Sequence, residues 1–542
     1  MKYTHYRLTA IASITLCALF LSACGKRMLN VDEATDQNIL LRGNGAEPES
    51  IDPHLATGAP DGQIICSLIE GLIAYHKTDD NIPEPGLAEK WESSDNSRIW
   101  RFHMRENAKW SNGEPVQAND FIYSYNRVLS ASLASEYAPL LYVMKNAKEF
   151  HSGVISDFTK VGVKAIDQRT IEFTLTGPTP HFANMLKHAT WFPVHKDTIE
   201  NHGGMTNRVS SWTRAGNYVG TGPFILEEWV PNQIIKVKKN PHYWDADNVE
   251  LEAIYFFPIS NIHTENRSFL NGQLHITNEL PFEAIDDFKD QPIYRNDPFM
   301  SVYYYMINTT KPPLNDIRVR QALSLAIDRK SITEDITRRG ETPATGYTPP
   351  GFENYESPNV LKYNPREAKT LLAEAGFPNG EGFPMQQILF NNHAGHQAIA
   401  EAIQQMWKEN LNIDVELYNQ EWKVYLETRN RMDYSIARAG WSGDYMDPDT
   451  FLHIWKTEEN DSLNDTGWSN TLFDEHLEAA NQSDALEERY KHLVEAETIL
   501  LNELPNIPIY WYTRPFLIDT RVRGWEPKLL DNRNFKYLSF EK

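Results

Sequence analysis

The stretch DYSIARAGWSGDYMDPDTFL, residues 433–452, joins a strand-like run to a glycine-containing turn that carries charges of both signs. Arg438, Trp441 and Asp444 lie close together in it, and no apolar alternation explains them as part of a core. These side chains could be catalytic, could hold an ion, or could grip a ligand that itself carries both charges. The rest of the chain decides between these three possibilities.

Catalytic and metal motifs do not fit this turn. The glycines around Ser442 lack the G-x-S-x-G spacing of a nucleophile elbow. Asp444, Asp447 and Asp449 lack the glycine and the terminal glutamate that a calcium loop requires. We instead expect Asp447 to cap a short helix whose first turn contains Pro448.

No other stretch supplies an enzyme motif. His393 and His396 form H-x-x-H, without the glutamate and the i,i+4 spacing of a zinc protease. Neither a phosphate-binding loop nor a G-x-G-x-x-G fingerprint occurs. The sequence therefore predicts that the protein is not an enzyme and has no metal site and no cofactor.

Length and charge limit the class of protein further. A chain of 542 residues exceeds one ordinary core, so two or three domains are expected. The net charge of -22 argues against nucleic acid or an anionic membrane as the main partner. Strand-like runs alternate with helix-like runs, which predicts an α/β protein. The strand-like runs are 38–43, 99–104, 170–175, 233–239, 253–259, 301–308, 413–419, 433–439 and 507–513, and the helix-like runs are 120–129, 318–327, 366–375, 396–411, 422–431 and 486–501.

One helix has complete end signals. Asn364 is expected to cap it, Pro365 fits its first position, and Gly376 can adopt the left-handed conformation that ends it. These three residues predict the bounds of the 366–375 helix from local chemistry alone.

The N-terminus has the pattern of an export signal. Lys2 and Arg7 precede a short apolar run and small residues, which predicts a signal peptide over 1–23. The sequence LSAC resembles a bacterial lipobox, in which Cys24 would be acylated; a plain signal peptide with a chance cysteine is the alternative. The polar residues 24–38 are expected to form a tether. No later stretch is apolar for the length of a membrane span, so lipid would be the only membrane attachment.

Cys66 would be the one cysteine left after export and acylation. Cys17 leaves with the signal peptide, so no intramolecular disulfide is expected. Because Cys66 lies in an apolar helical pattern, we expect a buried core thiol.

Six long stretches carry a resemblance to a known family. They are EPESIDPH (47–54), the run from PEPGLAEKW to YSYNRV (83–128), the run from GTGPF to NPHYW (220–244), KPPLNDIRVRQALSLAIDR (311–329), NQEWKVYLETR (419–429) and ARAGWSGDYMDPDTFL (437–452). The chain resembles the oligopeptide-binding proteins of ATP-driven (ABC) peptide permeases, which are family 5 extracellular solute-binding proteins of the peptide/nickel class. The segments KWSNGEPVQANDF and NPHYWD are hallmarks of that family.

The resemblance implies a periplasmic-binding-protein-like fold of type II. Two lobes would be joined by crossing segments, would close on a ligand by a hinge, and would carry an extra inserted domain. Domain I is expected to comprise 39–69, 197–296 and 514–542; the inserted domain II, 70–196; and domain III, 297–513.

The resemblance also implies roles for the opening turn. Asp444 would hold the α-ammonium group of an extended peptide whose backbone is paired as in a β-strand. Gly440 and Ser442 would pair with the first ligand residues, and Trp441 would cover the site. The basic residues implied to meet C-terminal carboxylates of the ligand are Arg438, Arg429 and His396. The aromatic residues implied to line the site are Trp422, Tyr512 and Tyr137. The extended segment implied to pair with the ligand backbone comprises Thr57, Gly58 and Ala59.

Purely structural roles are open alternatives. Asp444 could be a turn residue, Arg438 a surface residue in an ion pair, and Arg429 a cation at a helix C-terminus. His396 could equally be structural, and Trp422 and Tyr512 could be ordinary core.

The sequence departs from some family members at three positions. Ser301 and Ser442 stand where those members have a disulfide, and Met306 stands where they have an acidic residue. These differences leave the ligand preference open.

We therefore predict a monomeric, lipid-anchored solute-binding component, exported to the periplasmic or cell-surface face, that captures oligopeptides and delivers them to an ABC permease. A dedicated binder of murein tripeptide, glutathione or haem is the first alternative. A surface adhesin or a chaperone-like lipoprotein is the second, and it would need no ammonium anchor.

Overall fold

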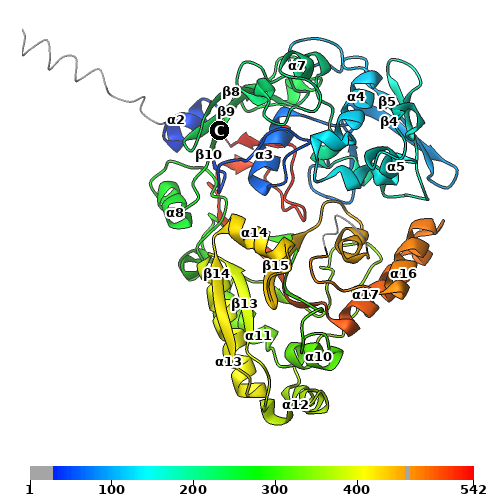
Figure 1. Ribbon diagram of the computed structural model, residues 1–542. Helices are drawn as coiled ribbons and strands as arrows, with labels where there is room; N and C mark the ends of the chain where they lie inside the picture. Colours follow the sequence, from blue (N-terminus) through cyan, green and yellow to red (C-terminus); the bar gives the residue numbers. More distant parts are fainter. Residues whose placement is uncertain (1–28, 458–463, 542) are drawn as a thin grey trace, which may run out of the picture.

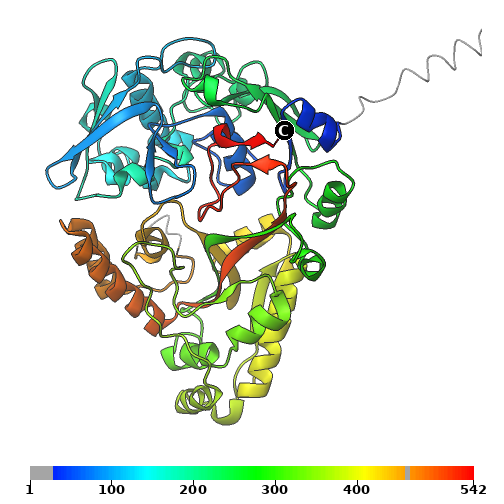
Figure 2. The same ribbon diagram turned by 180° about the vertical axis from the view of Figure 1, so that it is seen from behind.

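The computed structural model describes residues 29–457 and 464–541, so the predicted signal peptide and Cys24 lie outside the described residues. The chain forms two lobes (Figures 1 and 2). Its first half builds the upper lobe, the segment drawn from green through orange builds the lower lobe, and the red C-terminal segment returns to the upper lobe. None of the helices in the described ranges combines the length and apolar character that a membrane span requires.

The lower lobe is built around a six-stranded sheet. Its strand order is β12-β16-β11-β15-β13-β14. Alternate residues of β11 point to opposite faces and enter two separate cores, one with Val302, Tyr304 and Met306 and the other with Tyr303, Tyr305 and Ile307. The strands are β11 (Tyr294–Ile307), β12 (Thr342–Pro343), β13 (Gln386–Asn391), β14 (Val415–Gln420), β15 (Ile436–Ser442) and β16 (Asn506–Leu517).

The upper lobe contains two four-stranded sheets with separate cores. One has the order β1-β10-β9-β8 and the other, drawn in blue and cyan, β4-β5-β7-β6. The strands of the upper lobe, with the pairs β2–β3 and β17–β18, are β1 (Ile39–Gly43), β2 (Ile73–Tyr75), β3 (Pro83–Pro85), β4 (Ala88–Ser94), β5 (Ile99–Met104), β6 (Val163–Ala165), β7 (Thr170–Thr174), β8 (Phe224–Val230), β9 (Ile234–Lys239), β10 (Ala253–Phe257), β17 (Val522–Arg523) and β18 (Ser539–Phe540).

The α-helices cover these sheets. They are α2 (Val31–Asp36), α3 (Ala59–Leu68), α4 (Ala118–Val128), α5 (Ala147–His151), α6 (Phe182–Met185), α7 (Lys196–Asn201), α8 (Ile262–Leu270), α9 (Ile285–Phe288), α10 (Ile317–Leu325), α11 (Arg329–Ser331), α12 (Pro365–Glu374), α13 (Ala394–Leu411), α14 (Trp422–Asn430), α15 (Asp449–Leu452), α16 (Thr471–Gln482) and α17 (Leu486–Glu503). The predicted end signals of α12 are confirmed. The side chain of Asn364 accepts from the Glu367 amide, and Gly376 has a φ of +101°.

The segment predicted to be a tether is partly folded. Residues 31–36 form α2, whose N-cap Asn30 makes a reciprocal capping box with Glu33. Ala34 is fully buried, and the Val31 amide donates to the Gly272 carbonyl at 2.9 Å. Only Asp32 and Asp36 of this short helix are exposed, whereas Val31 and Ala34 pack in an apolar cluster with β1 and β10. These contacts and the cap attach α2 to the upper lobe.

A long antiparallel ribbon connects the lobes. In β11 and β16, Asp297 pairs with Arg514 and Pro298 with Thr513, and the register then shifts before Val302. This irregularity separates the part of the ribbon in the lower sheet from the part that enters the upper lobe. The residues expected to begin and end domain III, 297 and 513, therefore lie at neighbouring positions of this ribbon.

Cys66 is only half-buried in α3, not part of the innermost core. Burial nonetheless raises the pKa of its thiol to about 12. The thiol is therefore protonated at neutral pH and unreactive.

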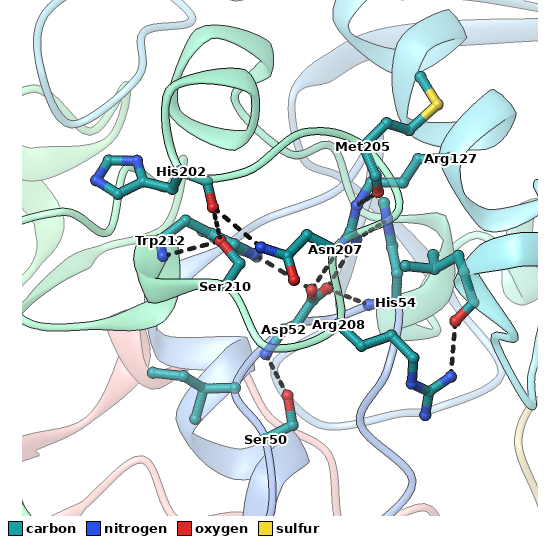
Figure 3. A network of polar contacts seen from close by, with 12 residues as sticks. Ser50, Asp52, His54, Arg127, His202, Met205, Asn207, Arg208, Ser210 and Trp212 are labelled. Atoms are coloured by element: carbon teal, nitrogen blue, oxygen red, sulfur yellow. Dashed lines mark hydrogen bonds and ion pairs between the residues drawn. The ribbon is translucent and has the colours of Figure 1, made fainter.

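Two of the family-like stretches meet in a buried ion pair (Figure 3). Asp52, of the SIDPH stretch, accepts two bonds from Arg127 of α4, at 2.9 and 2.5 Å. Trp212 donates to the same carboxylate at 3.3 Å, and Arg127 also donates to His54 Nδ1 at 2.8 Å. Both charged side chains are almost fully buried. These residues hold the upper lobe together and do not contact the site described below.

Ser301 and Ser442 lie side by side, as the resemblance implied. They are paired in register across β11 and β15, and their hydroxyl oxygens are 3.1 Å apart.

We expect the double variant Ser301→Cys/Ser442→Cys to form a disulfide, because directly opposed residues of an antiparallel pair have the Cα separation that a disulfide needs. The bridge should stabilise the protein by about 2–4 kcal/mol. Thiol titration under denaturing conditions and melting temperature measure the effect, with Ser301→Cys alone as the control. If both introduced thiols stay titratable after mild oxidation, in addition to Cys66, the observed register is contradicted.

Candidate ligand-binding site between the lobes

The charged residues of the opening stretch lie on a strand and on the turn that follows it. β15 continues through Arg438, Gly440 and Trp441 to Ser442, three residues beyond the strand-like run 433–439 that the sequence indicated. The strand is longer because β11 offers hydrogen-bonding partners as far as Ser301. The chain then turns at Gly443, whose amide donates to the Met300 carbonyl at 2.9 Å.

Asp444 is a nearly buried carboxylate without a cationic side chain beside it. Its side chain is 11% exposed, and its amide donates to Thr450 Oγ1 at 2.9 Å. The hydroxyl of Tyr137, from the upper lobe, hydrogen-bonds the carboxylate. Across residues 29–457 and 464–541, no Lys or Arg forms an ion pair with Asp444. Burial raises the pKa of Asp444 to about 6.

The nearest basic group is a neutral histidine. His188 Nε2, also from the upper lobe, lies 3.9 Å from Asp444 Oδ1. Burial lowers the pKa of His188 to about 4, so the ring carries no charge at neutral pH. Its ring packs against Tyr137 with the centroids 4.7 Å apart. The charge of His453 acts on Asp444 and partly opposes the effect of burial. Once ionised, Asp444 has no lysine or arginine beside it among the described residues and is only weakly compensated.

Arg438 is the opposite case, a cation without a carboxylate. Its Nη2 donates to the Tyr512 hydroxyl at 2.8 Å, and its guanidinium lies 4.8 Å from the Tyr303 ring centroid. Nε has no hydrogen-bond partner, and no carboxylate of the described part of the chain forms an ion pair with this residue. Tyrosine contacts stabilise a cation less than a carboxylate does, so Arg438 can accept an anion.

His396 joins this positive end of the site. Its ring packs on Tyr303 at 5.6 Å. Burial lowers the pKa of His396, and the nearby positive charge of Arg438 lowers it further. The structure therefore brings together Arg438, His396 and Tyr512, as the resemblance implied for a basic, aromatic end.

The backbone between Arg438 and Asp444 is accessible at Gly440. Gly440 is exposed, and a Cβ there would lie 3.4 Å from both Arg438 Nη2 and the Tyr512 hydroxyl. From Arg438 to Ser442 the strand rises roughly 13 Å, at about 3.3 Å per residue. That length corresponds to a short extended peptide.

The other expected site residues are placed differently. Arg429 is paired with Asp465 at 3.0 Å, so its charge is already compensated. Trp422 is 48% exposed and stacks on Tyr425, so it is neither core nor enclosed. Trp441 is half-buried and donates to the Thr450 carbonyl at 2.7 Å.

The segment of residues 57–59 is only partly extended. Thr57 and Gly58 are exposed and Gly58 has extended dihedrals, but Ala59 already begins α3. The helix starts there because Gly58 occupies the N-cap position and Pro60 fits the first turn.

Several residues at the site were missed from the sequence. His188 and Tyr75 come from the upper lobe, and the Asp444 charge acts on Tyr75. Tyr303 lies in the strand-like run 301–308, in which no site residue was predicted. No local pattern marks these residues, because only the packing of the two lobes brings them to β15.

The lobes enclose this site from two sides. Tyr445, which follows Asp444 in the chain, packs into the core formed by residues 72–191 of the upper lobe. Two α/β lobes, a connecting ribbon and a charged site enclosed between them define the class of bilobal, type II periplasmic-binding-protein-like folds.

Comparison with known proteins identifies the family. The family described as bacterial extracellular solute-binding proteins, family 5 (middle part), matches residues 83–462. The periplasmic oligopeptide-binding protein OppA of Salmonella typhimurium is 36% identical over 519 residues, which cover 93% of each chain. The chain therefore belongs to the family 5 bacterial extracellular solute-binding proteins.

Solved structures agree with this assignment. The oligopeptide-binding protein OppAIV of Borrelia burgdorferi has a TM-score of 0.84 at 33% identity, covering 93% of this chain and 100% of its own. The murein tripeptide binding protein MppA of Escherichia coli has a TM-score of 0.83 at 34% identity, covering 93% and 98%. The unliganded open form of MppA scores 0.73 at the same identity. The present arrangement of the lobes is therefore less similar to that open form.

Proposed function

We propose that the protein captures short peptides between its lobes and passes them to an ABC permease. The observation that carries this proposal is the separation of two charges without ion-pair partners, Arg438 on β15 and Asp444 on the turn that follows this strand. Among the described residues, no lysine or arginine pairs with Asp444 and no carboxylate pairs with Arg438, and a peptide zwitterion supplies both partners. Enclosure by the lobes removes water from these contacts, which makes each ion pair stronger than it would be in solvent.

The backbone of β15 supports a sequence-tolerant mode of binding. Gly440 leaves the strand accessible, and main-chain pairing is possible with any peptide. The named relatives include oligopeptide-binding proteins and a murein tripeptide binder. A site that recognises only the two terminal charges and the backbone of a ligand accepts peptides of many sequences. General peptide binding is therefore the function that we favour.

A dedicated murein tripeptide binder is the second candidate. The similarity to MppA is as high as that to the oligopeptide binders. Native mass spectrometry of gently purified protein separates the two. A ladder of co-purified peptide masses supports general binding, and a single mass supports a dedicated ligand.

Capping the ligand tests the role of Asp444 as an ammonium anchor. We expect trialanine to bind at least tenfold more tightly than N-acetyl-trialanine at pH 7.5, because acetylation removes the charge that Asp444 needs. Isothermal titration calorimetry measures both affinities, and trialanine amide is the matched control for the other terminus. Equal affinities for the acetylated and the parent peptide would overturn the anchor assignment.

The lipid anchor at Cys24 and the export of the chain also belong to this proposal. They rest on the LSAC stretch and the basic, apolar start of the sequence. Mass spectrometry of the N-terminal peptide from membranes of the native cell tests them, because diacylglyceryl-Cys24 has a defined mass.

A further inference from the structure

A histidine of the upper lobe is inserted into the lower lobe beside the candidate site. His181 lies at the start of α6, and its side chain is only 10% exposed. Its ring stacks on Tyr445 with the centroids 5.8 Å apart and an interplanar angle of 13°. Its Nδ1 lies 3.5 Å from Asp447 Oδ2 and has no hydrogen-bond partner among the described residues. This contact joins the lobes and requires them to be closed.

The carboxylate that His181 approaches is already neutralised. Asp447 pairs with Arg489 at 2.8 Å, and both side chains are 1% exposed. Arg489 in turn donates to the Asn481 side chain at 3.0 Å. The carbonyl oxygen of Asn481 lies so close to Gly177 that a Cβ atom on this glycine would be only 2.4 Å from it. A protonated His181 therefore meets an ion pair and not a lone carboxylate.

All the charged groups around the His181 ring come from the lower lobe. Asp447 and Asp449 lie on the turn and on α15, Arg489 lies on α17, and Tyr445 covers the ring face. Burial lowers the pKa of His181 to about 4; Asp447 opposes this shift, Arg489 adds to it, and Asp449 opposes it. The buried ring is therefore neutral at physiological pH.

We propose that His181 makes closure of the lobes sensitive to protons, so that the protein holds its ligand at neutral pH and opens in mild acid. The inference rests on the proposed function, since it concerns the closed form in which a peptide would be held. In the open form the ring is exposed to water and has the ordinary histidine affinity for a proton. The form that binds the proton more tightly is favoured as pH falls, and this is the open form.

The size of the effect follows from the two proton affinities. With a pKa of about 4 in the closed form and of about 6.5 in the open form, the closed form is disfavoured roughly 30-fold at pH 5.0 and hardly at all at pH 7.5. Asp444 adds its own acid sensitivity, because protonation removes the charge that holds an ammonium. The contribution of His181 is therefore the difference in acid sensitivity between the parent and a variant that lacks His181 but keeps Asp444.

The pH dependence of binding tests the inference. Trialanine affinity is measured by calorimetry at pH 7.5 and 5.0 for the parent, for His181→Gln, and for His263→Gln as an exposed control on the same lobe. Between pH 7.5 and pH 5.0, we expect the control to lose as much trialanine affinity as the parent does. We expect the loss for His181→Gln to be smaller by up to 30-fold. If His181→Gln no longer binds at pH 7.5, His181→Phe keeps the stacking on Tyr445 and is used instead.

A second measurement needs no variant. The titration of the His181 ring is followed by NMR in the parent, with and without saturating trialanine, and we expect a pKa below 5 in the complex and near 6.5 without ligand. The same value in both states, or the same acid loss in His181→Gln as in the parent, would overturn the inference. Absence of trialanine binding by the parent at pH 7.5 would instead contradict the proposed function.

Discussion

Replacing Asp52 with asparagine will destabilise the upper lobe by about 3–5 kcal/mol, because it leaves the buried guanidinium of Arg127 without its counter-charge. The two side chains are 4% and 1% exposed, so water cannot replace the lost partner. Burial acts to raise the pKa of Asp52, but the adjacent Arg127 outweighs it and the net pKa is lowered. The Asp52 carboxyl is therefore ionised at neutral pH.

Urea unfolding followed by tryptophan fluorescence measures this effect, since Trp212 donates to the same carboxylate. Glu106→Gln is the control in the same lobe: it removes an exposed partner of Arg169 and should leave the unfolding curve unchanged. The double variant Asp52→Asn/Arg127→Met should recover part of the loss, because it removes the unpaired charge. An Asp52→Asn protein as stable as its parent would show that the pair contributes no net stability.

Replacing Asp444 with asparagine will weaken trialanine binding by about 2–5 kcal/mol, which is 30-fold or more, while the fold is kept. Asparagine has the same shape and still accepts from Tyr137, but it leaves the ligand ammonium enclosed without a negative charge. Because burial raises the pKa of Asp444 to about 6 in the empty site, the parent should lose affinity as pH falls below that value. The variant should lack this component of the pH profile.

Calorimetry at pH 7.5 measures the loss, and circular dichroism checks that the variant is folded. Asp433→Asn is a suitable control, since Asp433 is an exposed aspartate of the same lobe. Unchanged trialanine affinity in Asp444→Asn would show that the ammonium group binds elsewhere on the protein.

Local features of the fold were predictable because their causes are local. The capping by Asn364 and the left-handed Gly376 depend on neighbouring backbone groups, so the bounds of α12 follow from the sequence. The aromatic run in β11 was recognisable as a strand because β-branched and aromatic residues favour the pleated conformation. The prediction of a tether over residues 24–38 missed α2, because the helix is held by a contact with Gly272, which lies far away in the sequence.

The candidate site was predictable only where a resemblance supplied it. Arg438, Asp444 and Gly440 were found on the resemblance, and the structure shows the two charges without ion-pair partners among the described residues. Arg429 looked equivalent to Arg438 in the sequence. Asp465, which compensates Arg429, lies 36 residues away, so no local pattern distinguishes the two arginines.

The sequence by itself determined the elements, the family and the charged strand of this protein, because hydrophobic period, capping residues and motif spacing act over a few residues. The tertiary structure decided which charges remain uncompensated. Asp52, Asp444 and Asp447 are similar aspartates in the sequence, yet one anchors the upper lobe, one is left for a ligand, and one receives a histidine of the other lobe. Whether a buried charge has a partner depends on segments that only the folded chain brings together, and this is what separates a structural ion pair from a binding site.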